Sequence, residues 1–367
     1  MTAHITAIET IPFAIPLTGS VTFATGKLTA AEHLLVRVHC DAGVVGHAEA
    51  IPRPMIYGET LVSIAHAIDT LIAPAMVGME IHSTRQIEHR LRNVAGNVAA
   101  RSSVELALFD LIGKVHNVSC HQLLGGYTDS MRCTQILGSG DAARLSAEMD
   151  KLAAEAGIDS FKIKVGLNLG HDIDLVLKLR EHAPDALLYV DANHGFTAAE
   201  AVQFARATAG ALAWIEEPCS ADEVMGRADV LQAATVPILA DESGITTREV
   251  VGEVLGRRSS MVGLKLQRTG IHTSERIREF AAALGVPVLV ASQGDSAIGT
   301  HASVSVAAAS PVTSSLPAEL AYFRLLEDDL TIERPAIKAG RMSVPAGAGF
   351  GLEIDADKLA RYRTDRA

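Results

Sequence analysis

The sequence of 367 residues is poor in aromatic side chains, which make up 4% of it, and contains one tryptophan. Hydrophobic residues still make up 48%, so alanine and the aliphatic side chains must fill a sizeable core. No apolar run approaches the roughly 18 residues that span a bilayer, and no signal-peptide pattern opens the chain. Basic residues number 32 against 43 acidic ones. This excess of negative charge argues against nucleic acid and anionic membranes as partners.

The sequence also lacks any pair of cysteines at metal-binding spacing. Its four cysteines are scattered along the chain, at Cys40, Cys120, Cys133 and Cys219. This spacing favours neither a zinc cluster nor a disulfide framework. We therefore expect buried free thiols in a protein of the reducing cytoplasm.

The first part of the chain combines strand patterns with helical ones. Residues 33–39 and 44–50 flank the turn Asp41-Ala42-Gly43, which predicts a β-hairpin. Residues 18–26 are rich in Gly, Ser and Thr and predict a loop. Helical periodicity follows over residues 59–76, 83–94 and 99–117. Strands followed by helices indicate an α+β domain.

From about residue 131, short apolar runs alternate with helical segments. Continuous apolar strands indicate a parallel sheet that is covered on both faces. Eight such strands predict a (β/α) barrel rather than an open sheet. The expected strands are residues 133–137, 160–165, 187–191, 212–216, 238–241, 261–265, 286–291 and 315–319.

Charged residues end five consecutive strands of this predicted barrel, although the strands themselves are apolar. They are 24 to 27 residues apart in the sequence, which matches one βα unit, and are Lys164, Asp191, Glu216, Asp241 and Lys265. The carboxyl ends of the strands form one rim of such a barrel, and that rim holds the active site. We therefore expect these five side chains to converge.

The three carboxylates of this series predict a metal site. Asp191, Glu216 and Asp241 would repel one another unless a cation lay between them. Oxygen ligands without histidine or cysteine suit Mg²⁺ or Mn²⁺ and disfavour zinc or copper. Glu217 follows Glu216 directly, and only one of the two can point inward from a strand.

Lysines flank the carboxylates on both sides. Lys162 and Lys164 are two residues apart on one strand, so they share a face, and Lys265 comes from the opposite side. A metal beside two opposed lysines suits proton transfer α to a carboxylate, because the metal stabilises the enolate and a lysine moves the proton. Three lysines and a divalent cation outweigh three carboxylates by about two charges, which favours an anionic substrate.

These motifs resemble those of the enolase superfamily, specifically its muconate lactonizing enzyme subgroup. The resemblance rests on Lys162-Ile163-Lys164, Asp191-Ala192-Asn193, Glu216-Glu217-Pro218, Asp241-Glu242-Ser243 and Lys265-Leu266-Gln267. It implies an α/β protein with an N-terminal α+β capping domain over residues 1–125. A modified (β/α)₇β barrel of the TIM type then spans residues 126–330, and residues 331–367 return to the cap.

The resemblance also assigns roles to these residues. Asp191, Glu216 and Asp241 match the ligands of Mg²⁺ or Mn²⁺, with Glu217 as second choice for the middle ligand. Lys164 and Lys265 match the acid/base pair, with Lys162 beside them. A small-molecule carboxylate is the implied substrate, and a homo-oligomer is the implied assembly.

The ends of two strands narrow the choice among the reactions of this superfamily. The seventh strand ends in Ser292-Gln293-Gly294-Asp295 and lacks the catalytic histidine of the mandelate racemase subgroup. The eighth carries Pro317-Ala318-Glu319 in place of the Asp-x-Asp typical of dipeptide epimerases. Muconate cycloisomerase is therefore favoured. N-acylamino acid racemase, o-succinylbenzoate synthase and dipeptide epimerase remain alternatives with the same enolate, and a non-catalytic metal-binding relative is a remote one.

Substrate contacts are expected from both domains, since in this superfamily the cap supplies specificity. Arg53 and Tyr57 are the candidates for the distal carboxylate of a dicarboxylate, and Phe23 is a candidate lid contact. On the barrel side the candidates are Asn193 and Glu319, the latter also as a supporting hydrogen-bond acceptor.

Overall fold

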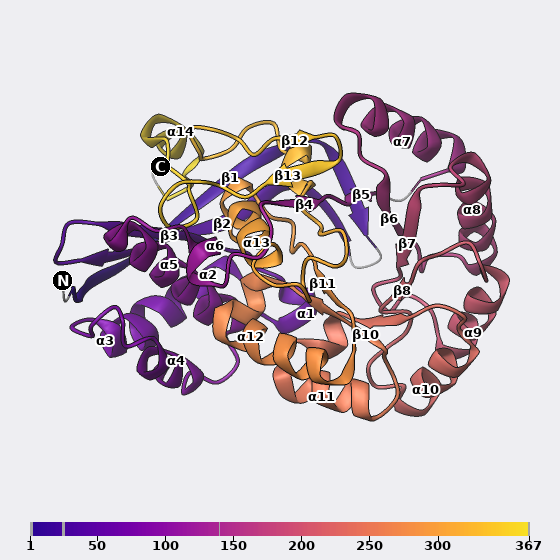
Figure 1. The fold of residues 1–367 in the computed structure, drawn as a ribbon, viewed down its shortest axis with the longest axis horizontal. Coiled ribbons are helices and arrows are strands. Elements are labelled where there is room, and N and C mark those ends of the chain that lie inside the picture. Colours follow the sequence, from indigo (N-terminus) through magenta and orange to yellow (C-terminus); the bar gives the residue numbers. More distant parts are fainter. Residues whose placement is uncertain (1–2, 24–25, 139, 366–367) are drawn as a thin grey trace.

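The computed structural model describes residues 3–23, 26–138 and 140–365, with the side chains of residues 20–28 outside that description. It contains an N-terminal antiparallel sheet, a curled parallel sheet of seven strands, and a small antiparallel sheet (Figure 1). The small sheet is formed by β12 (Ile337–Lys338), β13 (Arg341–Ser343) and β4 (Ser130–Arg132). Helices α7 (Ala142–Ala156) to α11 (Thr247–Leu255) line the outside of the curled sheet. The expected fold class, a (β/α) barrel with an N-terminal α+β cap, is confirmed.

The N-terminal sheet is a meander of β1 (Ile5–Phe23), β2 (Gly26–Cys40) and β3 (Val45–Ala50). Ile11, Phe13 and Ile15 are buried while the residues between them are partly exposed, as the two-residue period of a strand requires. The predicted hairpin of β2 and β3 is confirmed. The predicted loop over residues 18–26 is wrong for residues 18–23, because β1 continues through Phe23; its Thr, Val and Phe residues favour extended backbone. Residues 24 and 25 of the predicted loop lie outside the described residues.

Helices of the cap cover one side of this sheet. The helical pattern over 59–76 is divided, because Pro74 has no N–H to continue the regular ladder, and a π-helix, η1 (Ile68–Ile72), separates two α-helices. The helices are α1 (Pro54–Tyr57), α2 (Leu61–Ala67), α3 (Ala73–Met76), α4 (Thr84–Arg92), α5 (Val98–His116) and α6 (Cys120–Leu123).

A glycine lets α5 approach β3 closely. A Cβ atom at Gly46 would lie 2.0 Å from the carbonyl oxygen of Ala107 and 2.7 Å from the Cβ of Leu111. We therefore expect Gly46→Ala to lower the free energy of unfolding by about 1–3 kcal/mol through overpacking. Urea denaturation measures this loss. Gly43→Ala is the control for the space, since a Cβ there meets nothing within 4 Å, although its φ of 74° adds backbone strain. Equal losses in both variants would contradict the packing argument.

The curled sheet has the strand order β11-β10-β9-β8-β7-β6-β5, and all its pairs are parallel. Its strands are β5 (Gln135–Leu137), β6 (Ser160–Lys164), β7 (Leu187–Asp191), β8 (Ile215–Glu216), β9 (Ile238–Ala240), β10 (Met261–Leu264) and β11 (Val288–Val290). Helices connect successive strands: α7 (Ala142–Ala156), α8 (Leu169–His182), α9 (Ala198–Ala207), α10 (Val224–Ala233), α11 (Thr247–Leu255) and α12 (Leu266–Leu284).

The eighth predicted strand, over residues 315–319, is wrong as a regular strand. Pro317 cannot donate a ladder hydrogen bond, and the segment forms only an isolated bridge between Ala318 and Cys133. It nevertheless joins the two sheet edges. Glu319 N donates to the Val290 carbonyl at 3.0 Å, and Thr134 N donates to the Ala318 carbonyl at 2.8 Å. The barrel is thus closed at this point by a few backbone hydrogen bonds rather than by a regular strand ladder.

The C-terminal part of the chain crosses back to the N-terminal sheet. After α13 (Ala297–Ala307), β12 (Ile337–Lys338) pairs with β13 (Arg341–Ser343), which pairs with β4 (Ser130–Arg132). Helix α14 (Ala356–Tyr362) lies beside β1 (Figure 1), and Arg363 forms a bridge with Phe13. The domain boundaries expected from the resemblance stay a prediction.

The cysteines are all buried and free, as expected from the sequence. Among the described residues, no helix is both long and apolar enough to cross a membrane.

Candidate active site

The five charged strand ends meet at one rim of the barrel. Parallel register places Lys164 of β6 opposite Asp191 of β7, and Asp191 opposite Glu216 of β8. Asp241 follows β9, and Lys265 follows β10, the next strand of the sheet. All five side chains are buried. The convergence predicted from their spacing is therefore present in the fold.

The three carboxylates can hold a metal ion. One oxygen from each of Asp191, Glu216 and Asp241 lies within 4.8 Å of the others. Burial, and then the charge of Asp191, holds the pKa of Glu216 well above its usual value. Glu216 Oε2 is buried without a hydrogen-bonding partner in the described structure. An orphaned carboxylate oxygen beside two other carboxylates is the donor set that a hard divalent cation requires.

The structure separates the two adjacent glutamates. Glu217 has φ = 37° and turns away from the triad. Its Oε1 accepts from Arg227 Nη1 at 2.7 Å, and its Oε2 accepts from the backbone N of Asp241 and the hydroxyl of Ser243. Glu217 is therefore fully engaged in a buried ion pair, and the geometry favours Glu216 as the metal ligand.

Lys162 is an internal counter-charge for the carboxylates. Its Nζ lies 2.9 Å from Asp191 Oδ2, 2.8 Å from Glu216 Oε1 and 2.9 Å from Glu319 Oε1. Burial lowers the pKa of Lys162, but these carboxylates outweigh it and hold the pKa well above its ordinary value. Lys162 therefore stays protonated here and acts by its charge.

Lys164 and Lys265 face the site from opposite sides, as the sequence predicts. Lys164 Nζ donates to Asp191 Oδ2 at 2.6 Å and to Asn193 Oδ1 at 2.8 Å. Lys265 donates to Asp241 Oδ2. Burial lowers the pKa of Lys265, but Asp241 outweighs it and raises the pKa overall. Both lysines line the cavity described below, so both can reach a bound molecule.

Two groups at this rim were not identified from the sequence. Arg268 donates to the carbonyl oxygen and to Oδ1 of Asp241, both at 2.8 Å. Glu242 accepts from Asn193 Nδ2 at 2.8 Å, and burial followed by the charge of Asp241 raises its pKa to about 8. The position of Arg268, three residues after Lys265 at the start of α12, could have signalled its proximity.

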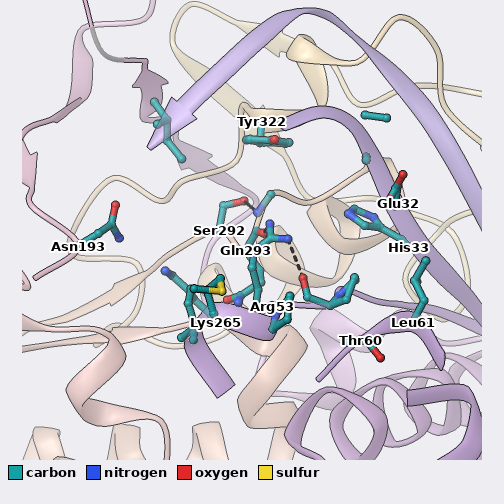
Figure 2. A pocket seen from close by; sticks show the side chains of 18 of the residues that line it. Glu32, His33, Arg53, Thr60, Leu61, Asn193, Lys265, Ser292, Gln293 and Tyr322 are labelled. Carbon is teal, nitrogen blue, oxygen red and sulfur yellow. Dashed lines mark hydrogen bonds between the residues drawn. The ribbon is translucent and has the colours of Figure 1, made fainter. Parts of the chain in front are cut away.

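A cavity of about 630 Å³ lies above the rim, between the barrel and the cap. Figure 2 shows Asn193 and Lys265 on one side of it and His33, Thr60 and Leu61 on the other. Ser292, Gln293 and Arg53 lie between them. The cap therefore forms one wall of the cavity, and the charged rim forms the opposite end.

The expected substrate contacts fall into different environments. Arg53 lines the cavity, but its guanidinium donates to the carbonyls of Pro52 and Gln293. The hydroxyl of Tyr57 donates to the Ile51 carbonyl at 2.8 Å and accepts from Gln293 Nε2 at 3.0 Å. Both therefore join the cap to the loop after β11. Their contact with a distal carboxylate stays a prediction.

The remaining candidates also differ in access. Asn193 lines the cavity beside Lys164. Glu319 is 1% exposed, and its oxygens accept from Lys162, Tyr189 and the backbone N of Ser292. This arrangement supports the rim from below, as the alternative role expected for Glu319 requires. The side chain of Phe23 lies outside the described residues.

A carboxylate triad flanked by two lysines, at the carboxyl rim of a (β/α) barrel under an α+β cap, defines an enzyme of enolate chemistry. Comparison with known families agrees. Residues 6–125 match the mandelate racemase/muconate lactonizing enzyme N-terminal domain, and residues 144–358 match the enolase C-terminal domain-like family. The chain belongs to the mandelate racemase/muconate lactonizing enzyme family of the enolase superfamily.

Relatives of known activity divide between reactions. The structure of the muconate lactonizing enzyme of M. smegmatis in complex with muconolactone superimposes with a TM-score of 0.97, at 40% identity over 100% of both chains. Muconate cycloisomerase 1 of Pseudomonas putida is 30% identical over 90% of each chain. L-Ala-D/L-Glu epimerase of Bacillus subtilis is 31% identical over 82% of this chain and 84% of its own.

Proposed function

We propose that the protein is a muconate cycloisomerase, which interconverts cis,cis-muconate and muconolactone with Mg²⁺ or Mn²⁺. Glu319 is the residue whose hydrogen bonds favour a cycloisomerase over an epimerase. Both of its oxygens are occupied by groups of the protein, and it is not part of the cavity wall. Among the described residues, the end of the barrel-closing segment therefore offers no free carboxylate to hold the α-ammonium of a dipeptide.

The residues of the rim divide the work of this reaction. Asp191, Glu216 and Asp241 would hold the cation. When bound, it supplies positive charge that stabilises the substrate carboxylate as negative charge develops there. Lys162 adds fixed positive charge from below. Asn193, which accepts from Lys164, holds the amine of that lysine at the edge of the cavity.

The lysines perform the proton transfer. The distal carboxylate of muconate adds to the conjugated double bond, so that a C–O bond forms and the π electrons move toward the other carboxylate as an enolate. Nζ of Lys164 or Lys265 then donates a proton to the α carbon, and solvent restores the proton to the lysine. The second lysine stays cationic near the enolate. Which lysine donates depends on whether the addition is syn or anti.

A substrate panel tests this proposal. The purified protein is incubated, with Mg²⁺ and separately with Mn²⁺, with cis,cis-muconate, N-succinyl amino acids and dipeptides. We expect kcat/KM for muconate to exceed the others by at least about tenfold. Faster racemisation of N-succinyl amino acids or dipeptides would overturn the cycloisomerase assignment in favour of the corresponding alternative. A lack of turnover, together with no exchange of α protons, would favour a non-catalytic relative.

A further inference from the structure

The cap wall of the cavity contains a histidine whose ring is fixed from behind. His33 lies on β2 and lines the cavity, although only 2% of it is exposed. Its Nδ1 lies 2.9 Å from Oε2 of Glu49 on β3. An ionised carboxylate can only accept, so Nδ1 carries the hydrogen of this contact. The partnership leaves Nε2 as the free edge of the ring.

Glu49 is itself held by the start of α13. Its oxygens accept from the backbone N and the hydroxyl of Ser296, at 3.0 and 2.6 Å, and from the backbone N of Gly299 at 2.9 Å. These hydrogen bonds connect the cap to the helix that follows the seventh barrel strand. His33 is therefore attached to a rigid junction rather than to a surface loop.

A second contact restrains the plane of the ring. The rings of Phe13 and His33 are 5.7 Å apart with an angle of 77° between their planes, an edge-to-face arrangement. Within the described part of the chain, no hydrogen-bonding partner meets Nε2 of His33. A ring that is fixed at one nitrogen and along one face, and that borders a cavity, is prepared to bind a ligand through its other nitrogen.

We propose that His33 is a specificity-determining residue that binds the distal carboxylate of the substrate through Nε2–H. This inference rests on the proposed function, because it requires a substrate with two carboxylates. The three lysines line the barrel end of the cavity and contact the metal ligands there, so the carboxylate that becomes the enolate would bind at this end. His33 occupies the cap wall at the other end of the same cavity (Figure 2).

The charges around His33 are compatible with this role. Arg53 also lines the cavity and adds positive charge. Glu32, the neighbour of His33 in β2, is exposed to solvent, so water screens its repulsion of a bound carboxylate.

Two substitutions separate ligand binding from a purely structural role. The amide nitrogen of asparagine overlays Nδ1 of histidine, so His33→Asn keeps a donor toward Glu49 and removes the edge that faces the cavity. The amide nitrogen of glutamine overlays Nε2, so His33→Gln keeps a donor toward the cavity and loses the contact with Glu49. His39→Gln is the matched control, since His39 lies on the same strand, outside the cavity wall, near Glu9.

The measurement is the dissociation constant, by calorimetry with Mg²⁺ present, of two inert six-carbon acids: adipate with two carboxylates and hexanoate with one. We expect His33→Asn to weaken adipate binding about 10- to 100-fold, as for loss of a charged hydrogen bond, with hexanoate unchanged. His33→Gln should lose less of the affinity for adipate, and His39→Gln should lose none of it. Thermal unfolding of each variant reports whether it folds.

Several outcomes would overturn the inference. One is equal weakening of adipate and hexanoate, and another is unchanged adipate binding in His33→Asn. A third is stronger adipate binding in His33→Asn than in His33→Gln, since that order indicates that the contact with Glu49 alone matters. Adipate and hexanoate are not turned over, so these results are independent of the muconate assay. Failure of that assay overturns the proposed function and leaves the adipate comparison to decide the role of His33.

Discussion

Replacing Lys164 or Lys265 with alanine should lower kcat for muconate by about 10³-fold or more. Each substitution removes an amine that either donates the proton to the α carbon or stabilises the enolate by its positive charge. Both amines line the cavity, and each contacts a carboxylate of the triad. Loss of either lysine also removes positive charge from beside the carboxylate that it contacts. Steady-state kinetics, followed by the loss of the conjugated diene absorbance, measures the change.

The matched control for these variants is Lys178→Ala. Lys178 lies on α8, is exposed, and pairs with Asp174 of the same helix at 2.7 Å. Such surface pairs contribute little to stability, so we expect kinetics and unfolding like those of the unaltered protein. Circular dichroism should show that the Lys164 and Lys265 variants keep the fold. A Lys164→Ala, Lys265→Ala double variant with unaltered rates would contradict the mechanism.

Glu216→Gln should abolish the stabilisation that Mg²⁺ gives the protein, and with it nearly all turnover. Burial and Asp191 raise the pKa of Glu216, so the folded protein tolerates loss of this charge when no metal is bound. Ligand binding raises the free energy of unfolding by mass action, about 2.7 kcal/mol at a hundredfold excess over Kd. Thermal unfolding with Mg²⁺ and with a chelator measures this difference, which the variant should lack.

The neighbouring substitution Glu217→Gln should lower the stability of the protein but keep its response to Mg²⁺. Arg227, which is 1% exposed, would lose the negative charge of Glu217, whose Oε1 lies 2.7 Å from its Nη1, and would keep only Glu253 as a charged partner. Breaking a buried pair costs about 3–5 kcal/mol of stability, even in the presence of a chelator. If Glu217→Gln removed the response to Mg²⁺ while Glu216→Gln kept it, the assignment of the ligand would be wrong.

The rim of the site was predictable because the carboxyl ends of parallel barrel strands all lie on the same side of the barrel. One βα unit separates each charged residue from the next, so Asp191, Glu216 and Asp241 had to converge once the barrel was recognised. The alternation of side chains on a strand likewise predicted that Lys162 and Lys164 share a face. These regularities depend on backbone geometry alone, which the apolar pattern of the strands encodes.

Contacts between elements far apart in the sequence were not predictable in this way. The pairing of His33 with Glu49 follows from the register of β2 and β3 and from the docking of α13, neither of which a local pattern encodes. The hydrogen bonds of Glu319 to Lys162 and Tyr189 depend on the closure of the barrel. The barrel is closed by isolated hydrogen bonds near Pro317, so the strand that the sequence pattern predicts over residues 315–319 does not form.

In the proposed reaction, the rim converts cis,cis-muconate through an enolate that a lysine protonates. The most direct measurement is proton NMR of the product formed in D₂O with Mg²⁺ or Mn²⁺. We predict muconolactone with one deuterium at the methylene carbon α to its free carboxylate, and no product from the Lys164→Ala, Lys265→Ala double variant. Muconate that remains unchanged in the presence of the metal, or a product without deuterium at that carbon, would contradict this mechanism.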